Sequence, residues 1–123
     1  MAKITSYTYT IRIGDDFRQK LTLKDKETGN PLNLSGYSFK MEIRECKSNL
    51  DPILTLESPL GISGIGIEID DAINGNIFLI ISKNITKDLT DTNAVYDLKW
   101  TTDVGQVTTI LEGNIQILET VTK

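Results

Sequence analysis

Apolar and polar residues alternate along most of the chain, and this pattern predicts short β-strands. Over residues 7–13 the odd positions are apolar or aromatic and the even positions are polar. A period of two is typical of a strand with one buried face. The alternation resumes over residues 17–23, 39–44 and 52–57. Clusters of Gly, Pro, Asp and Asn lie between these runs, so we expect turns to connect the strands.

The clearest hairpin pattern lies at residues 65–81. Isoleucines alternate over residues 65–69, Asn74-Gly75 follows, and residues 77–81 are apolar throughout. An Asn-Gly pair favours a two-residue type I′ turn, in which both residues have positive φ. A strand that is apolar on both faces is typical of a central position in a sheet. We therefore expect a hairpin whose second strand is central.

One stretch departs from the strand pattern. Residues 82–91 read SKNITKDLTD, in which Ser82 can cap a helix and Ile85 and Leu89 are spaced four apart. This spacing places both apolar side chains on the same side of a helix. We predict one short helical turn near residues 83–89.

The last hairpin contains the chain's single tryptophan. Tyr96, Leu98 and Trp100 share one face of a strand, residues 103–106 are expected to form the turn, and residues 107–118 return. On the return strand the apolar positions change from even numbers near residue 110 to odd numbers near residue 115. Side chains alternate strictly, so such a change requires an extra residue. We predict a β-bulge near Glu112-Gly113.

Together these patterns define the fold class. Seven or eight short strands without intervening helices of 10–15 residues predict an all-β protein, and an immunoglobulin-like antiparallel β-sandwich fits best. A chain of 123 residues supports one core. We expect a single β-sandwich domain at residues 11–123, preceded by an N-terminal strand or arm at residues 1–10.

Composition narrows the classes of function. The longest apolar runs are far shorter than a membrane span of about 18 residues, and the N-terminus resembles no signal peptide, so we expect no membrane association and synthesis in the cytoplasm. The net charge is −4 and the 13 basic residues are dispersed, which disfavours binding to nucleic acid. Cys46 is the single cysteine and histidine is absent. A disulfide within the chain, a Cys-His nucleophile and a zinc site with histidine are therefore excluded.

Acidic residues offer two kinds of candidate site. Asp97 and Glu112 could pair across a sugar as in a glycosidase, and Asp15-Asp16 or Asp70-Asp71 could bind calcium. The first two lie on predicted strands, and the acidic pairs lack the D-x-D-x-D spacing of a calcium loop. A solvated sheet face and turn chemistry explain them better.

Trp100 and the tyrosines could likewise form a platform on which a sugar stacks. Trp100, however, belongs to the alternating apolar set and is expected in the core. We therefore assign no catalytic residue, no metal ligand and no cofactor, and we expect no enzymatic activity.

The order of turn and core residues resembles a family of small tailed-phage and prophage virion proteins. The stretches GDDFRQKLTLKDKETGNPLNLSGYSFKMEIRE and YDLKWTTDVGQVTTILEG are similar to the N-terminal immunoglobulin-like domain of the phage baseplate upper protein. The matching positions are Gly14, Asp15, Phe17, Leu21, Leu23, Asp25, Gly29, Pro31, Leu34, Gly36, Tyr37, Ile43, Arg44, Tyr96, Asp97, Leu98, Gly105, Leu111, Glu112 and Gly113. The likeness extends from about Ile11 to Leu118.

The resemblance implies a structural role in a virion, as a tail, baseplate or fibre-anchoring adaptor that forms a trimer or ring and docks on other virion proteins. The family domain heads a longer chain, whereas this sequence ends at Lys123, so a free-standing virion component is expected in place of a receptor binder. A capsid decoration or head–tail protein, or a module that binds carbohydrate or a cell surface, remains an alternative.

The N-terminal segment precedes most of the matched positions, and it is the candidate interface. Tyr7, Tyr9, Ile11 and Ile13 share its apolar face. Tyrosines are enriched where proteins meet. We expect this face to contact a neighbouring subunit.

Overall fold

The computed structural model describes residues 5–25, 27–48, 51–59 and 64–122. These residues contain nine strands and one helix, which follow along the chain as β1 (Thr5–Ser6), β2 (Tyr9–Arg12), β3 (Phe17–Thr22), β4 (Ser38–Arg44), β5 (Leu54–Glu57), β6 (Ile65–Asp71), β7 (Asn76–Ile81), α1 (Lys83–Thr86), β8 (Thr92–Thr101) and β9 (Val107–Leu118).

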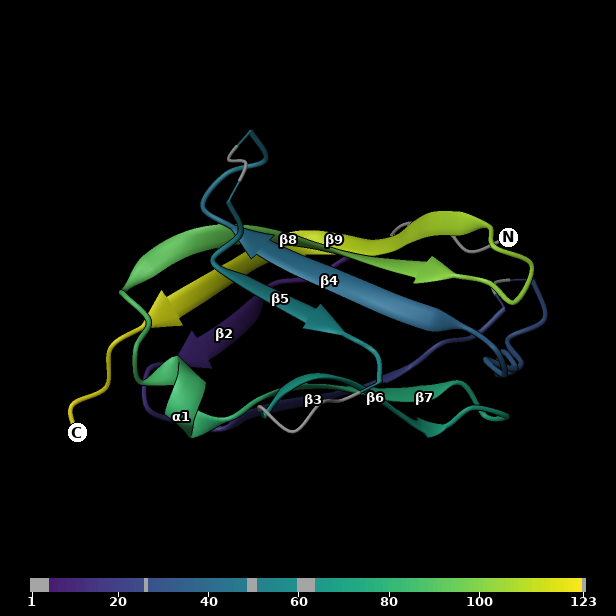
Figure 1. Ribbon diagram of the computed structural model, residues 1–123, viewed down its shortest axis with the longest axis horizontal. Helices are drawn as coiled ribbons and strands as arrows, with labels where there is room; N and C mark the ends of the chain where they lie inside the picture. Colours follow the sequence, from purple (N-terminus) through teal and green to yellow (C-terminus); the bar gives the residue numbers. More distant parts are fainter. Residues whose placement is uncertain (1–4, 26, 49–50, 60–63, 123) are drawn as a thin grey trace.

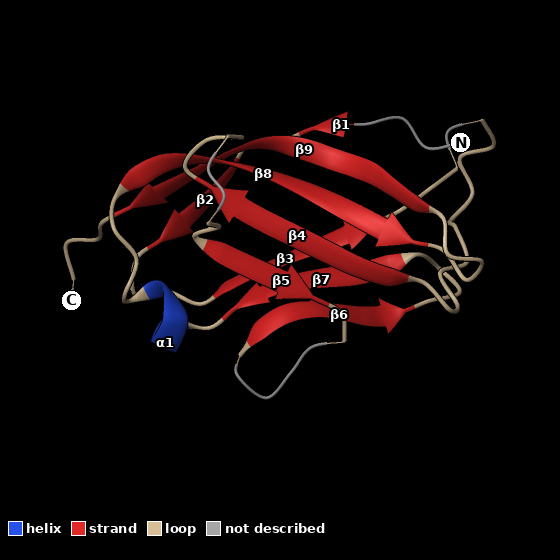
Figure 2. Cartoon of the chain, turned by 45° about the horizontal axis from the view of Figure 1, so that its top comes forward, coloured by secondary structure: helices blue, strands red, loops and turns tan. Residues whose placement is uncertain are grey.

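The strands form two sheets that face each other (Figure 1). The larger sheet has the order β1-β9-β8-β4-β5, with β2 also paired to β9, and the smaller has the order β3-β7-β6. Helix α1 lies at one end of the sandwich, where the chain passes from β7 to β8 (Figure 2). The expected all-β sandwich is confirmed.

The strand order is that of an immunoglobulin sandwich. In that fold the second, fifth and fourth strands form one sheet, and the third, sixth and seventh form the other, with an extra strand beside the third in variable-type domains. Here β3, β7 and β6 form the first group, and β4, β8 and β9, with β5 beside β4, form the second. The strands are therefore divided between the two sheets in the immunoglobulin order.

The N-terminal strands depart from the antiparallel pairing expected of the whole fold. Both β1 and β2 pair with β9 in the parallel direction, with Thr5 opposite Leu111 and Ile11 opposite Ile117. Parallel neighbours require a long connection, and nearly the whole domain lies between these strands. The division expected between residues 1–10 and 11–123 falls inside β2, so the N-terminal segment is continuous with the sandwich.

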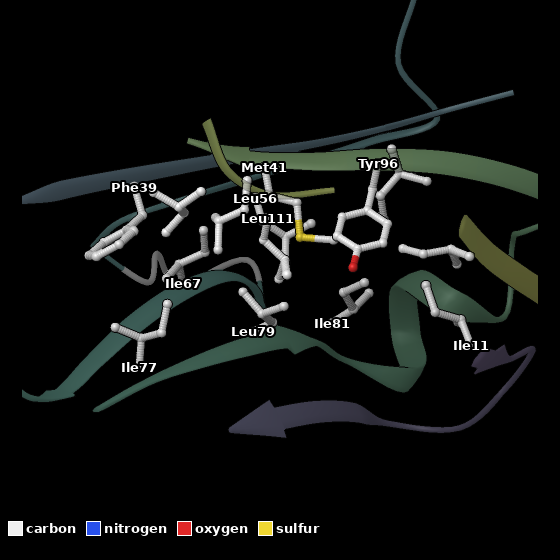
Figure 3. Packing of buried hydrophobic residues seen from close by; sticks show 14 of the residues in the cluster. Ile11, Phe39, Met41, Leu56, Ile67, Ile77, Leu79, Ile81, Tyr96 and Leu111 are labelled. Carbon is white, nitrogen blue, oxygen red and sulfur yellow. The ribbon is translucent and has the colours of Figure 1, made fainter. Parts of the chain in front are cut away.

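The core lies between the two sheets and is built from the inward positions of the alternating runs (Figure 3). Tyr96, Leu98 and Trp100 are buried, as their pattern predicted. The side chains with the lowest exposure are Ile11, Leu34, Met41, Ile43, Leu56, Ile67, Ile77, Leu79, Ile81, Leu98, Ile115 and Ile117. Burial of a side chain of this size contributes about 1.5–3 kcal/mol to folding, so this layer stabilises the domain.

The β6–β7 connection differs from the predicted type I′ turn. Strand β7 is central, as expected, but the loop spans residues 72–75, and Gly75 has positive φ whereas Asn74 does not. A Cβ on Gly75 would overlap the carbonyl oxygen of Leu23 and lie 3.0 Å from that of Leu32. The loop is therefore longer than predicted, and its glycine lies against this neighbouring backbone.

The predicted bulge in β9 is present, but its position was wrong. Leu98 pairs with Leu111 and Lys99 pairs with Thr109, so Ile110 is the extra residue. Ile110 and Leu111 are each 6% exposed. The bulge turns both side chains inward and causes the change of parity, while pairing continues without interruption through Gly113.

The predicted helical turn is confirmed, although it is shorter than residues 83–89. It spans Lys83–Thr86, and the side chain of Ser82 makes no capping hydrogen bond. The backbone N–H of Lys83 instead donates to Oδ1 of Asp16 at 2.7 Å. A carboxylate from a distant turn therefore caps this helix. In the part of the chain that the structure describes, no helix is long and apolar enough to span a membrane.

Candidate functional site

The candidate interface residues differ in exposure. Ile11 is completely buried in the chain's own core, and Tyr9 and Ile13 are half-buried against it. Tyr7 is 54% exposed. Tyr7 is therefore the member of this set that offers an accessible aromatic surface, whereas Ile11 cannot contact a partner while the domain is folded.

The N-terminal segment is held by a cluster of aromatic rings. The ring of Tyr9 lies 6.2 Å from that of Tyr7, 6.3 Å from that of Phe17 and 5.5 Å from that of Tyr96, measured between centroids. The Tyr96 hydroxyl donates a 2.9 Å hydrogen bond to the carbonyl oxygen of Tyr7. Strand β8 thereby fixes the chain where it passes from β1 to β2.

At this point the backbone of Tyr7 approaches β9 closely. The N–H of Tyr7 donates to the carbonyl oxygen of Glu112 at 3.1 Å. A Cβ on Gly113 would overlap the carbonyl oxygen of Tyr7 and lie 2.9 Å from its carbonyl carbon. Gly113, which we had expected in a bulge, is instead the residue that lets the N-terminal segment lie against β9.

Burial changes the titration of two tyrosines in this cluster. It raises the pKa of Tyr96 strongly, and the neighbouring Tyr9 adds to the effect. Burial, with a smaller effect of Tyr7, also raises the pKa of Tyr9. Both hydroxyls therefore stay neutral in the folded protein at a pH where an exposed tyrosine ionises.

These shifts predict a loss of stability in alkali. The unfolded chain has tyrosine pKa values near 10.0. Because folding raises the pKa, the associated stability is complete below pH 10 and declines as pH rises through the folded values. Unfolding in urea at pH 8, 10 and 11 should show this decline, and Tyr96→Phe should make it shallower. An equally steep decline in Tyr96→Phe would contradict the assignment to Tyr96.

A groove opens beside the N-terminal segment, with a volume of about 610 Å³. Its lining comes from β3 and the chain that follows it, from residues 7–9, from Leu32, and from β8 and β9. We call it the N-terminal groove. It is lined by Tyr7, Thr8, Tyr9, Gln19, Lys20, Leu21, Thr22, Leu23, Lys24, Leu32, Trp100, Ile110 and Leu111.

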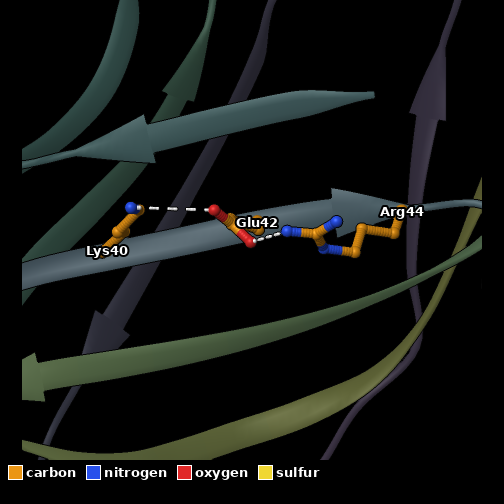
Figure 4. A network of polar contacts seen from close by, with 3 residues as sticks. All are labelled: Lys40, Glu42 and Arg44. Carbon is orange, nitrogen blue, oxygen red and sulfur yellow. Dashed lines mark hydrogen bonds and ion pairs between the residues drawn. The ribbon is translucent and has the colours of Figure 1, made fainter. Parts of the chain in front are cut away.

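The outer face of the larger sheet carries a row of three carboxylates. Glu42 on β4 lies opposite Asp97 on β8, which in turn lies opposite Glu112 on β9. Lys40 and Arg44 flank Glu42 along β4 and both form ion pairs with it (Figure 4). The hydrogen bond from Arg44 is the main reason that the pKa of Glu42 lies below its usual value.

No single site is formed by Asp97, Trp100 and Glu112. Asp97 and Glu112 are neighbours on the outer face, where a hollow of about 320 Å³ adjoins them. Trp100 lies on the inner face of β8 and packs edge-on against Tyr37, with ring centroids 5.4 Å apart. The two carboxylates therefore belong to a charged sheet face, and Trp100 belongs to the core.

This arrangement predicts that the Asp97 carboxylate is repelled by the carboxylates of Glu42 and Glu112 and so lowers the stability of the domain. Like charges directly opposite each other in a sheet are unfavourable. Among the described residues, Asp97 makes no ion pair, whereas Glu112 pairs with Lys47 at 3.7 Å. We expect Asp97→Asn to raise the free energy of unfolding by about 0.5 kcal/mol, measured in urea, with Lys99→Gln as the control on the same strand. A loss above about 1 kcal/mol would reveal a stabilising partner of Asp97.

The acidic pairs that were weighed as calcium ligands take part in turns. Asp16 caps α1, as described above, and Oδ2 of Asp71 accepts a 2.8 Å hydrogen bond from the Asn74 side chain. Among the described residues no cluster of three potential ligands could hold a metal ion. Cys46 is exposed in the loop after β4.

Comparison with known proteins shows a likeness to solved structures. No protein-family model matches the chain, and no curated protein matches it. A solved structure of murine CRIg is similar over 94% of this chain and 92% of that chain, with 16% identity and a TM-score of 0.40. The strand order of the chain itself, described above, defines an immunoglobulin-like sandwich.

Proposed function

We propose that this protein is a non-enzymatic structural component of a tailed-phage or prophage virion, acting as a tail, baseplate or fibre-anchoring adaptor that docks on other virion proteins. The proposal starts from the resemblance in sequence layout. Several of the matched residues have defined structural roles in the domain. Gly36 and Gly105 adopt positive φ, and Gly113 leaves space for the backbone of the N-terminal segment. The resemblance is thus carried by residues on which the sandwich depends.

The observation that carries the docking role is the N-terminal groove beside the outer edge of β3. Strand β3 stands at the end of its sheet, and an edge strand presents unpaired backbone groups to a neighbour. The adjoining groove offers apolar side chains next to that edge. Protein partners use both features, and a ring or trimer of this chain on the virion would place several such surfaces together.

The alternative roles differ in what they require. A capsid decoration or head–tail protein would use the same docking surfaces at another place on the particle. A carbohydrate-binding module needs exposed aromatic faces, and Tyr7 is the aromatic residue of this chain that is exposed. The groove and edge therefore favour a protein partner.

Isolation of particles tests the proposal. Virions produced from a genome that encodes the tagged protein should contain it in a fixed copy number, in a symmetric ring or trimer visible by cryo-electron microscopy. Tyr7→Ala should reduce incorporation, whereas Val104→Ala, which changes another exposed apolar side chain on the β8–β9 loop, should not. Absence from purified particles, together with a strict monomer at high concentration, would refute the proposal.

A further inference from the structure

The free backbone groups of β3 can be assigned to particular residues. The N–H of Leu23 donates to the carbonyl oxygen of Gly75 at 2.8 Å, on the side of β7. Backbone groups in a strand alternate in direction, so Leu21 and Gln19 also point toward β7. The N–H and C=O groups of Arg18, Lys20 and Thr22 consequently point to the opposite side, where the described residues provide no strand.

One hydrogen bond marks the same edge. The side-chain Nε2 of Gln19 donates to the carbonyl oxygen of Lys20 at 3.1 Å. This carbonyl group is therefore satisfied by a flexible side chain and not by a strand. Such a bond can be exchanged for one from an incoming backbone N–H at little cost, because one hydrogen bond replaces another.

The groove beside this edge has the chemistry of a receptor for side chains. Leucine, isoleucine and aromatic side chains dominate its lining, and its volume of about 610 Å³ lies within the range of about 300–1,000 Å³ that is usual for binding sites. In a strand paired to β3, alternate side chains would face the groove and the others would face outward. The groove thus selects apolar residues at every second position.

Charge restricts the outward positions. Lys20 and Lys24 line the groove, and no Asp or Glu does so among its described lining residues. Arg18 is already engaged, since its guanidinium lies 3.9 Å from the centre of the Phe78 ring and 4.0 Å from Glu68. Neither Lys20 nor Lys24 forms an ion pair within the described part of the chain. Two unpaired cations beside a strand edge favour carboxylates on the incoming strand.

We propose that the N-terminal groove and the free edge of β3 form a strand-addition site for an extended segment of a partner protein, with apolar residues at alternate positions and acidic residues between them. The main-chain hydrogen bonds supply affinity, and the groove and the two lysines supply specificity. This inference rests on the proposed function, because it names the docking site of that adaptor. Basic side chains on an edge also discourage indiscriminate sheet extension, and here they restrict the partner to an acidic strand.

Trp100 provides a direct test, because it is the single tryptophan of the chain and lines the groove. The probe is a capped peptide of alternating valine and glutamate, about seven residues long to match residues 18–24 at about 3.3 Å per residue. We expect a saturable change in Trp100 fluorescence and slower amide exchange at Lys20 and Thr22. A peptide with lysine in place of glutamate should bind at least about tenfold more weakly.

Two variants separate the edge from the charge. Thr22→Pro removes an N–H that points to the free edge while leaving both lysines and the backbone bonds to β7 in place, a substitution that edge strands tolerate. It should weaken peptide binding about tenfold or more. The double variant Lys20→Glu with Lys24→Glu should reverse the preference toward the lysine peptide. Lys99→Glu, on the outer face of the other sheet, is the matched control and should bind as the parent does. Thermal melting verifies that each variant is folded.

The outcomes are decisive for the strand-addition site. Absence of a saturable change at about 1 mM peptide, or equal binding of both peptides by the parent, would overturn it. So would unchanged binding by both the folded Thr22→Pro protein and the charge-reversed protein. The proposed virion role fails by a different result, namely absence of the protein from particles, which leaves peptide binding by the isolated protein unaffected.

Discussion

Replacing Gly113 with alanine is expected to lower the free energy of unfolding by about 3 kcal/mol, because the new methyl group overlaps the backbone of Tyr7. The φ of Gly113 lies outside the left-handed region, so the loss comes from the contact and not from backbone strain. Either the segment between β1 and β2 moves off β9, which breaks the bond from Tyr7 N–H to Glu112, or β9 itself shifts. Chemical denaturation of the parent and the variant measures the loss.

Two controls assign this effect to the N-terminal segment. Asn114→Ala, at the adjacent exposed position, should change stability by less than about 0.5 kcal/mol. In a chain that lacks residues 1–8, Gly113→Ala should cost little, and the reduced entropy of the unfolded chain can even favour alanine. A similar loss with and without residues 1–8 would show that the close approach to Tyr7 is not the cause.

Replacing Thr86 with valine is expected to lower the free energy of unfolding by about 2–3 kcal/mol. Thr86 is completely buried. Its hydroxyl donates to the carbonyl oxygen of Asp15 at 2.8 Å and accepts a hydrogen bond from the N–H of Gly14 at 3.2 Å. Valine has almost the same shape, so the substitution removes these two bonds while it preserves the packing, and both backbone groups lose their partner.

Thr86→Ser is the matched variant, since it retains the hydroxyl and removes one methyl group. It should cost about 1 kcal/mol, the value for a buried methyl group. Calorimetric melting distinguishes the two variants, because the valine protein should melt several degrees below the serine protein. If the serine variant were the less stable, the methyl group and not the hydroxyl would hold the Gly14-Asp15-Asp16 turn to α1.

The sequence predicted the sandwich because its signals are local. Alternation in residues 17–23, 39–44 and 65–81 depends only on which side of each strand is buried, and the burial of Leu98 and Trp100 follows from it. The change of parity in β9 likewise predicted a bulge. The location of the bulge depends on which β8 residue pairs with each β9 residue, and the sequence does not show this pairing. The sequence favoured Gly113, but this glycine instead accommodates the backbone of Tyr7.

Features that join distant segments could not be predicted in this way. The parallel pairing of β2 with β9, the cap that Asp16 provides for α1 and the N-terminal groove each bring together residues far apart in the chain. Alternation reports that Tyr7, Tyr9 and Ile11 share a face. Alternation cannot show that the folded chain itself buries Ile11 and leaves Tyr7 exposed. The candidate interface therefore included a residue that the folded domain buries.

The parallel pairing of β2 with β9 also has a consequence for biosynthesis. Strand β2 leaves the ribosome well before β9, because its partner, residues 115–118, is translated about 100 residues later. At about 5–20 residues per second, β2 waits on the order of 5–20 s for β9. During that interval the smaller sheet can form from β3, β7 and β6, whereas β2 remains unpaired. The chain therefore completes its sandwich only after β9 has been translated, and a product that stops before β9 would leave β2 and its aromatic residue Tyr9 without their partner strand.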